Sequence, residues 1–218
     1  DVASPEGFDR DPSLVWRFYS LRREAAARCS PNPGHRALAA LEARLGERFL
    51  LATQNVDGLH RVAGSERLVE MHGNLFTTRC AGCDRPPFRD EARYLDAVPR
   101  CDRCGAMLRP HIVWFGEMLD TADLRRIEDF INDSRGHRLV FIAAGTSGVV
   151  YPAAGLVDPG HAAGPAEQRV VEGVDRTVTT FPDLLNARSA DVAQFVVLLG
   201  PSGCGKSTLF RCLTRLVE

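Results

Sequence analysis

The chain has 218 residues, of which 44% are hydrophobic and 25% are charged, values typical of a globular protein. Its 27 basic and 28 acidic residues give a formal net charge of −1, so binding of nucleic acid through bulk positive charge is not expected. No apolar run approaches the ~18 residues of a membrane-spanning helix. The odd total of seven cysteines and the lack of a secretion signal favour a reducing compartment, and we expect a cytoplasmic protein.

Two helices are predicted near the start of the chain. Asp11 followed by Pro12 is typical of a helix N-terminus, and Asn32 followed by Pro33 repeats the pattern. Apolar residues then recur at helical spacing in both segments, and Gly46 is expected to end the second helix.

Short apolar segments predict the strands of a sheet, and they alternate with helical segments. The expected strands are residues 48–53, 67–71, 111–115 and 137–143, and a further helix is expected over 121–134. Alternation of this kind predicts an α/β fold with a Rossmann-like parallel sheet. The polar residues that follow the strands would then face one crevice.

Two C-x-x-C pairs, separated by 17 residues, lie within a loop-rich module over residues 78–109. They are Cys80, Cys83, Cys101 and Cys104. Each pair places two thiolates on one tight turn, and two such turns form a tetrahedral zinc site without an open position. We therefore expect a structural zinc in a small zinc-ribbon module, with disulfides or free thiols as the alternative.

Polar residues follow two of the expected strands. Gln54, Asn55 and Asp57 could bind a ribose, a carboxamide or a water, although a capped polar loop would use the same residues. His72 follows the next strand and could be a general base, but a lone histidine is often structural.

Five segments in order along residues 1–156 resemble the sirtuins, which are NAD-dependent protein-lysine deacylases. They are T-Q-N-V-D-G-L-H from Thr53, M-H-G-N from Met71, the two cysteine pairs, R-P-H-I-V-W-F-G-E from Arg109 and A-G-T-S-G from Ala144. Sirtuins have a Rossmann-type domain and a smaller zinc-bearing module, which agrees with the expected layout.

The resemblance implies a role for each of these positions. His72 would be the base in a reaction that releases nicotinamide and transfers the acyl group to ADP-ribose. The NAD-binding residues would be Gln54, Asn55, Asp57, Gly145, Thr146 and Ser147. The acyl-lysine peptide of a protein substrate would pair as an added strand with the segment that contains Val113, Phe115, Gly116 and Glu117.

Tyr19 and Arg22 lie three residues apart in the first predicted helix, and therefore on one face. Arginine binds a carboxylate bidentately and tyrosine adds a hydroxyl donor. An amphipathic helix with a surface arginine is the alternative. The pair is similar to that of the sirtuin branch that removes succinyl and malonyl groups, which favours acidic acyl chains.

The resemblance to sirtuins is incomplete. The family's Gly-Ala-Gly-rich phosphate loop and its last strands have no counterpart here, so we expect an incomplete sheet, an incomplete NAD pocket and impaired activity. Residues 157–190 have the character of a linker. Residues 191–218 predict a strand, a P-loop and a helix, and they resemble the start of an ABC-transporter ATPase.

The P-loop fits G-x-x-x-x-G-K-[ST] and would bind Mg-ATP, although only weakly and without hydrolysis. Its residues are Gly200, Gly203, Gly205, Lys206, Ser207 and Thr208. Two other functions therefore stay open. One is an ATP-binding module with an inert sirtuin part, and the other is a zinc-stabilised binding protein without catalysis.

Overall fold

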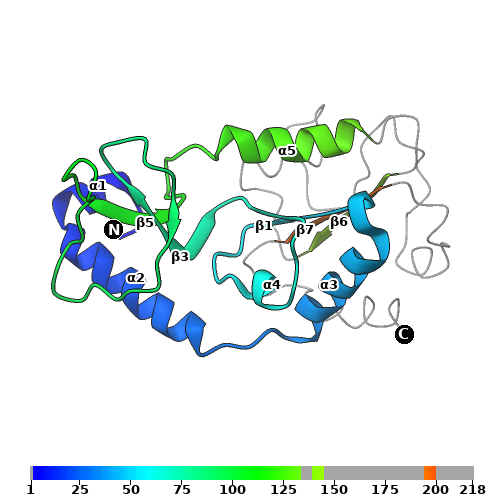
Figure 1. Ribbon diagram of the computed structural model, residues 1–218, viewed down its shortest axis with the longest axis horizontal. Coiled ribbons are helices and arrows are strands. Elements are labelled where there is room, and N and C mark those ends of the chain that lie inside the picture. The colour runs from blue at the N-terminus through cyan, green and yellow to red at the C-terminus, as the bar shows by residue number, and fades with distance from the viewer. Residues whose placement is uncertain (1, 134–138, 145–193, 200–218) are drawn as a thin grey trace. The chain divides into compact units, whose positions relative to one another are not determined.

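The computed structural model of the chain describes residues 2–133, 139–144 and 194–199 (Figure 1). The chain divides into two compact units, each built from three separate segments. The first unit comprises Asp1–Ser30, Asn55–Leu59 and His72–Leu119, and the second comprises Pro31–Gln54, His60–Met71 and Asp120–Glu218. The predicted linker over 157–190 lies outside the described residues.

The first unit begins with two helices, α1 (Pro5–Arg10) and α2 (Pro12–Ala27). Asp11 caps α2 as predicted, because its carboxylate accepts a 2.9 Å hydrogen bond from the backbone N–H of Leu14. Helix α1, which Ser4 caps in the same way, was not predicted from the sequence.

A three-stranded antiparallel sheet in the order β4-β3-β5 completes the first unit. Its strands are β3 (Gly73–Cys80), β4 (Phe88–Arg89) and β5 (Leu108–Ile112). Helix α2 packs against β3 and β5, and the three elements lie close together in Figure 1. The module over 78–109 therefore includes more strand than its irregular sequence indicates.

The strand expected over residues 111–115 is wrong in its bounds and in its sheet. The observed strand β5 ends at Ile112 and pairs antiparallel with β3, so it is not part of a parallel sheet. Phe115 consequently does not lie at the carboxyl end of a parallel strand. The physical reason is that Glu117 accepts the backbone N–H of Trp114 and turns the chain there.

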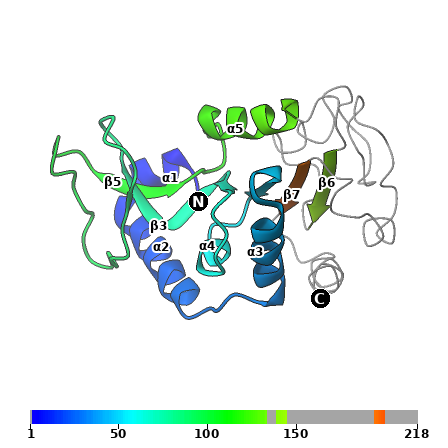
Figure 2. The ribbon, with the colours of Figure 1, turned by 45° about the vertical axis from the view of Figure 1, so that its right-hand side comes forward.

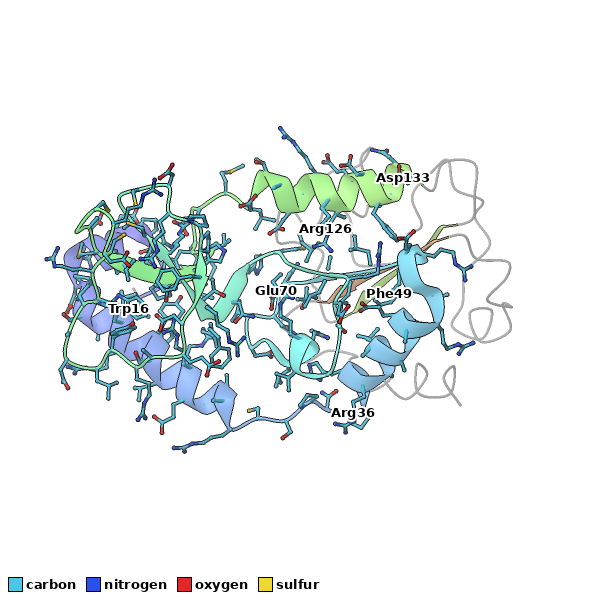
Figure 3. All side chains as sticks on the ribbon, viewed as in Figure 1. Trp16, Arg36, Phe49, Glu70, Arg126 and Asp133 are labelled. Atoms are coloured by element: carbon cyan, nitrogen blue, oxygen red, sulfur yellow. The ribbon has the colours of Figure 1, made fainter. Side chains whose placement is uncertain are left out.

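The core of the first unit lies between α2 and the sheet. Trp16 is fully buried, and its indole N–H donates to the carbonyl of Leu108 on β5 at 2.8 Å. Figure 3 shows Trp16 among closely packed side chains. Arg23 is also buried on α2 and donates to the carbonyl of Leu75 and the hydroxyl of Thr78, both on β3. These bonds fix the helix to the sheet.

The second unit contains a parallel sheet, as predicted, in the order β2-β1-β7-β6. Its strands are β1 (Phe49–Thr53), β2 (Leu68–Glu70), β6 (Leu139–Ala144) and β7 (Gln194–Leu199). All five residues of β1 are buried, which is expected for a strand inside a parallel sheet.

Helices α3 (Pro33–Leu45) and α5 (Thr121–Asn132) both contact β1, and their bounds agree with the predicted helices. A single 3-10 turn, η1 (Gly46–Arg48), connects α3 to β1. Gly46 ends α3 with a positive φ of 57°, as its position in the sequence predicted. None of the helices in the described residues is long and apolar enough to cross a membrane.

Strand β7 was predicted from its apolar sequence, but its neighbours were not. It pairs with β1 through Phe49 and Phe195 and with β6 through Leu139 and Gln194, in parallel register on both sides. Figure 2 shows β6 and β7 side by side. The described sheet is therefore continuous across the position of β7. The P-loop residues and the helix expected after them lie outside the described residues.

Candidate active site

The polar loop after β1, residues 55–59, belongs to the first unit and is held by one hydrogen bond within the loop and one to β3. The carboxylate of Asp57 accepts the backbone N–H of Leu59 at 2.9 Å and so begins the short helix α4 (Leu59–Val62). The carbonyl of Val56 accepts the N–H of Leu75 on β3 at 2.8 Å. Asn55 and Asp57 thus belong to the same compact unit as His72.

His72 lies directly before β3 and is half-buried. Its carbonyl accepts the N–H of Val113 at 3.0 Å, which joins the start of β3 to the segment after β5. Gly73 follows with a φ of 80°, and a β-carbon there would lie 1.9 Å from the carbonyl oxygen of His111. Only glycine permits this close approach of two backbones beside His72.

Gln54 belongs to the second unit and is 3% exposed. Its side-chain nitrogen is buried and has no hydrogen-bond partner among the described residues. A buried amide N–H without a partner is costly, and a ligand oxygen would satisfy it. This observation suits a residue that would contact a ribose hydroxyl.

Tyr19 and Arg22 differ in their exposure. Tyr19 is 1% exposed, and its hydroxyl oxygen accepts a 2.9 Å hydrogen bond from the indole N–H of Trp114. Burial raises the pKa of Tyr19, although the bond from Trp114 and the charge of Arg22 act in the opposite direction. Arg22 is exposed, and its guanidinium carbon lies 6.0 Å from the centre of the Tyr19 ring.

The segment from Val113 to Glu117 is half-open to solvent. Phe115 is 80% exposed, and Gly116 has a φ of 86° in the turn that follows. The backbone N–H groups of Val113, Trp114, Phe115 and Glu117 all donate to groups within the first unit. A peptide strand added here would have to donate to carbonyl oxygens of the segment, or displace these bonds.

Glu117 binds two arginines of the antiparallel sheet. It forms ion pairs with Arg109 at 2.6 Å and with Arg79 at 3.2 Å, and these two arginines are paired across β5 and β3. Burial would raise the pKa of Glu117, but the bonds from Arg109 and from the N–H of Trp114 hold it below its ordinary value. Glu117 is therefore an ionised, structurally engaged carboxylate.

The two cysteine pairs come together in the first unit, as predicted. All four sulfur atoms lie within 4.8 Å of one another, with 3.5 Å between Cys80 and Cys104 and 3.9 Å between Cys83 and Cys101. Four sulfurs bound to one zinc at about 2.3 Å lie about 3.8 Å apart. The arrangement has the size of a tetrahedral zinc site.

The thiols of this cluster differ in acidity. Burial favours the neutral thiol of Cys101, but the N–H groups of Arg103 and Cys104 stabilise its thiolate and lower its pKa to about 6. A bond from the N–H of Ala106 lowers the pKa of Cys104, but its contacts with Cys80 and Cys83 prevail and raise the value to about 12. When four thiols lie this close together, ionisation of one disfavours ionisation of the next, so their pKa values spread apart. A bound divalent cation would favour the thiolate form of all four.

The structure brings most of the predicted site residues into the first unit. The exceptions are Gln54, which lies in the second unit, and the residues that lie outside the described parts of the chain. The latter are Gly145, Thr146, Ser147, Gly200, Gly203, Gly205, Lys206, Ser207 and Thr208.

Sequence reasoning missed the contributions of Arg109 and Trp114. The guanidinium carbon of Arg109 lies 3.4 Å from the centre of the Trp114 ring, and Trp114 in turn contacts Tyr19. The signal for this network was Arg109 itself, an arginine between apolar residues. A buried charge requires a partner, so an acidic residue nearby could have been expected.

Comparison with known proteins settles the family. The family model described as "Sir2 family" matches residues 1–152, which is more than half of the chain. The chain belongs to the Sir2 family. Among solved structures, the sirtuin resembles a Sir2 homologue–NAD complex with a TM-score of 0.67 and 33% identity, covering 100% of this chain and 78% of that one. It also resembles Sir2Tm bound to a propionylated peptide, with a TM-score of 0.60 and 35% identity over 71% of this chain and 65% of that one.

Curated relatives of this sirtuin are similar in sequence over the same region. An NAD-dependent protein deacylase of Aquifex aeolicus is 43% identical over 156 residues, which is 72% of this chain and 63% of the relative. The mitochondrial NAD-dependent protein deacylase sirtuin-5 of Canis lupus familiaris is 42% identical over 71% of this chain and 56% of its own length. The chain thus spans between half and two thirds of these relatives.

Proposed function

We propose that this chain is an NAD-dependent protein-lysine deacylase, with His72 as its base. The observation that carries the proposal is the presence of Asn55, Asp57 and His72 in one compact unit, in a member of the Sir2 family. Relatives at 42–43% identity have the name NAD-dependent protein deacylase, which supports the same activity.

NAD would supply an electrophilic ribose carbon with nicotinamide as its leaving group. Asn55 and Asp57 would bind at the nicotinamide, and the buried amide nitrogen of Gln54, which has no partner in the described residues, fits a ribose hydroxyl. Gly145, Thr146 and Ser147 would contact the rest of the dinucleotide; the comparison with an NAD-bound Sir2 homologue supports this cofactor.

His72 would accept a proton from a ribose hydroxyl and so make that oxygen nucleophilic toward the acyl group. A neutral imidazole nitrogen can accept a proton, which suits a histidine to this step. The hydrogen bond from Val113 to the carbonyl of His72 fixes the backbone from which the imidazole projects. The acyl group would leave lysine and end on ADP-ribose.

The acyl-lysine peptide would lie along Val113, Phe115, Gly116 and Glu117, which is the segment with an exposed aromatic side chain. Since several N–H groups of this segment donate within the unit, the peptide would mainly donate its own N–H groups to the segment's carbonyls. The exposed Arg22 beside Tyr19 favours a succinyl or malonyl group, because its guanidinium can pair with the acyl carboxylate.

A zinc ion would be structural in this enzyme. The four cysteine sulfurs fit a closed tetrahedral site, which leaves no position for a substrate or water. The metal would stabilise the irregular chain between β3 and β5 and take no part in acyl transfer.

The proposal is tested by following nicotinamide release and deacylation of succinyl-lysine and acetyl-lysine peptides at saturating NAD. His72→Ala should lower kcat by about 10²- to 10⁴-fold. His161→Ala is a suitable control, because His161 lies beyond the residues that the family model matches. The proposal is wrong if the wild-type chain releases no nicotinamide, or if His72→Ala leaves kcat unchanged.

A further inference from the structure

The carboxylate of Glu117 has its acceptor sites filled inside the first unit. One oxygen accepts from Arg109 at 2.6 Å and from Arg79 at 3.2 Å. The other accepts from Arg109 at 2.9 Å and from the backbone N–H of Trp114 at 2.8 Å. A carboxylate offers about four lone-pair sites, so Glu117 has little capacity left for a substrate.

Arg109 connects this carboxylate to the aromatic core. Its guanidinium donates to the carbonyl of Ile112 at 3.1 Å and stacks on the Trp114 ring at 3.4 Å. Trp114 then donates to the hydroxyl of Tyr19 on α2. Glu117, Arg109, Trp114 and Tyr19 thus form one continuous network, and all four side chains are at least four-fifths buried.

The same network shapes an exposed turn. The N–H of Glu117 donates to the carbonyl of Trp114 at 3.0 Å, which closes a tight turn around Phe115 and Gly116. Both residues of the turn are exposed, whereas the two that flank it are held by Arg109. The two ends of the turn are therefore held in place, while its two central residues are accessible to solvent.

We propose that the side chain of Glu117 is a positioning group that holds the turn at Phe115 and Gly116 in the shape that receives the acyl-lysine peptide, without its carboxylate touching the peptide. This inference rests on the proposed function, because it assumes that the peptide binds along this segment. It differs from direct recognition by Glu117, in which the carboxylate would contact the peptide.

The test compares Glu117→Gln with Glu91→Gln in the full chain. Glu91 forms an exposed ion pair with Arg89 in the same unit. Glu91→Gln therefore measures the effect of the same carboxylate-to-amide change at a position away from the turn. Two readouts are needed. The first is the nuclear magnetic resonance signal of each indole N–H, and the second is the affinity for acetyl-lysine and succinyl-lysine peptides.

The chain has two tryptophans, Trp16 and Trp114, so each indole signal can be assigned. In Glu117→Gln the Trp114 signal should shift, while the Trp16 signal, which reports the bond to Leu108, should stay in place. Peptide dissociation constants should rise about tenfold for both acyl groups, as expected when charge-assisted bonds that hold the turn are lost. The value of kcat should change less than the affinity, and Glu91→Gln should alter neither readout.

An unmoved Trp114 signal in Glu117→Gln would overturn the inference, and so would unchanged peptide affinity. If Glu117→Gln does not fold, Arg79→Gln replaces it. The Arg79 side chain is 37% exposed, and its 3.2 Å ion pair with Glu117 is longer than the 2.6 Å pair that Arg109 forms. Arg79→Gln should weaken peptide binding in the same direction by a smaller factor, and unchanged binding would again overturn the inference. A wild-type chain that binds neither peptide would instead contradict the proposed function.

Discussion

The indole N–H of Trp114 donates a 2.9 Å hydrogen bond to the hydroxyl oxygen of Tyr19, two residues that are 95 positions apart in the chain. An indole is only a donor, so the proton of the Tyr19 hydroxyl must point toward another acceptor. Arg22 lies on the same helix, with its guanidinium carbon 6.0 Å from the centre of the Tyr19 ring. A carboxylate held by Arg22 would offer such an acceptor, which is the physical basis of the proposed preference for acidic acyl groups.

Arg22→Met should lower kcat/KM for a succinyl-lysine peptide by about ten- to a hundredfold, because a charge-assisted bond of about 1.5–3 kcal/mol is lost. Activity on an acetyl-lysine peptide should be nearly unchanged. Arg17→Met is the matched control, because Arg17 is an exposed arginine of the same helix. Equal losses on both peptides would show that Arg22 has a structural role and would contradict the assigned preference.

Gly73→Ala should destabilise the protein by more than about 3 kcal/mol. The added β-carbon would lie 1.9 Å from the backbone oxygen of His111, so β3 and β5 would have to separate. Gly64→Ala tests the effect of a positive φ alone, because Gly64 has a φ of 102° and no atom within 4 Å of the added carbon. Its cost should be about 1–2 kcal/mol. Urea unfolding of both variants measures the difference, and similar costs would exclude the clash as the cause.

Purified protein should contain about one zinc ion per chain, as measured by elemental analysis. Cys101→Ser should abolish zinc binding, because it removes one of the four ligands and a thiol whose pKa is lowered to about 6. Cys29→Ser should keep the metal, since Cys29 is exposed and lies outside the cluster. A metal-free wild-type protein with four reduced thiols would refute the zinc assignment.

The ion pair of Glu117 with Arg109 should make the stability of the protein depend on pH. The pKa of Glu117 is lowered in the folded state, so the stabilisation is complete above the carboxyl's unfolded pKa of about 4.3 and disappears as the pH falls through the lower folded value. Thermal unfolding of the wild type and Glu117→Gln should differ clearly at pH 7, and the difference should shrink below pH 4. A difference that is independent of pH would show that ionisation of Glu117 does not matter.

Sequence patterns predicted α2, α3, α5 and the parallel strands well, because those elements are specified by neighbouring residues, whereas the short helices α1 and α4 were not predicted. Asp11 and Asn32 cap the helices that they were expected to start, and Gly46 ends α3. Strand β1 was visible as a short apolar run because both of its faces are buried.

The patterns did not predict the antiparallel sheet or the network behind the exposed turn. Strand β5 contains Arg109 and Pro110, so its sequence is not typical of a strand. The charge of Arg109 is paired with Glu117, which lies eight residues later in a turn. The pairing of Trp114 with Tyr19 depends on contacts between distant parts of the chain, which no local pattern reveals. For the candidate site, motif resemblance supplied the residues that we propose, while their grouping in space required the structure.

The place of β7 in the sheet has a consequence for the order of folding. Phe49 of β1 pairs with Phe195 of β7, so the contact joins distant parts of the sequence, and among the described strands β6 pairs with β7 alone. During synthesis, β1 and β2 are made long before β7, so in the described sheet one hydrogen-bonding edge of β1 stays unpaired until β7 is made. Contacts at such long sequence separation slow folding. A nascent chain that lacks β7 would therefore leave an unpaired strand edge on β1, and unpaired edges are sites of aggregation.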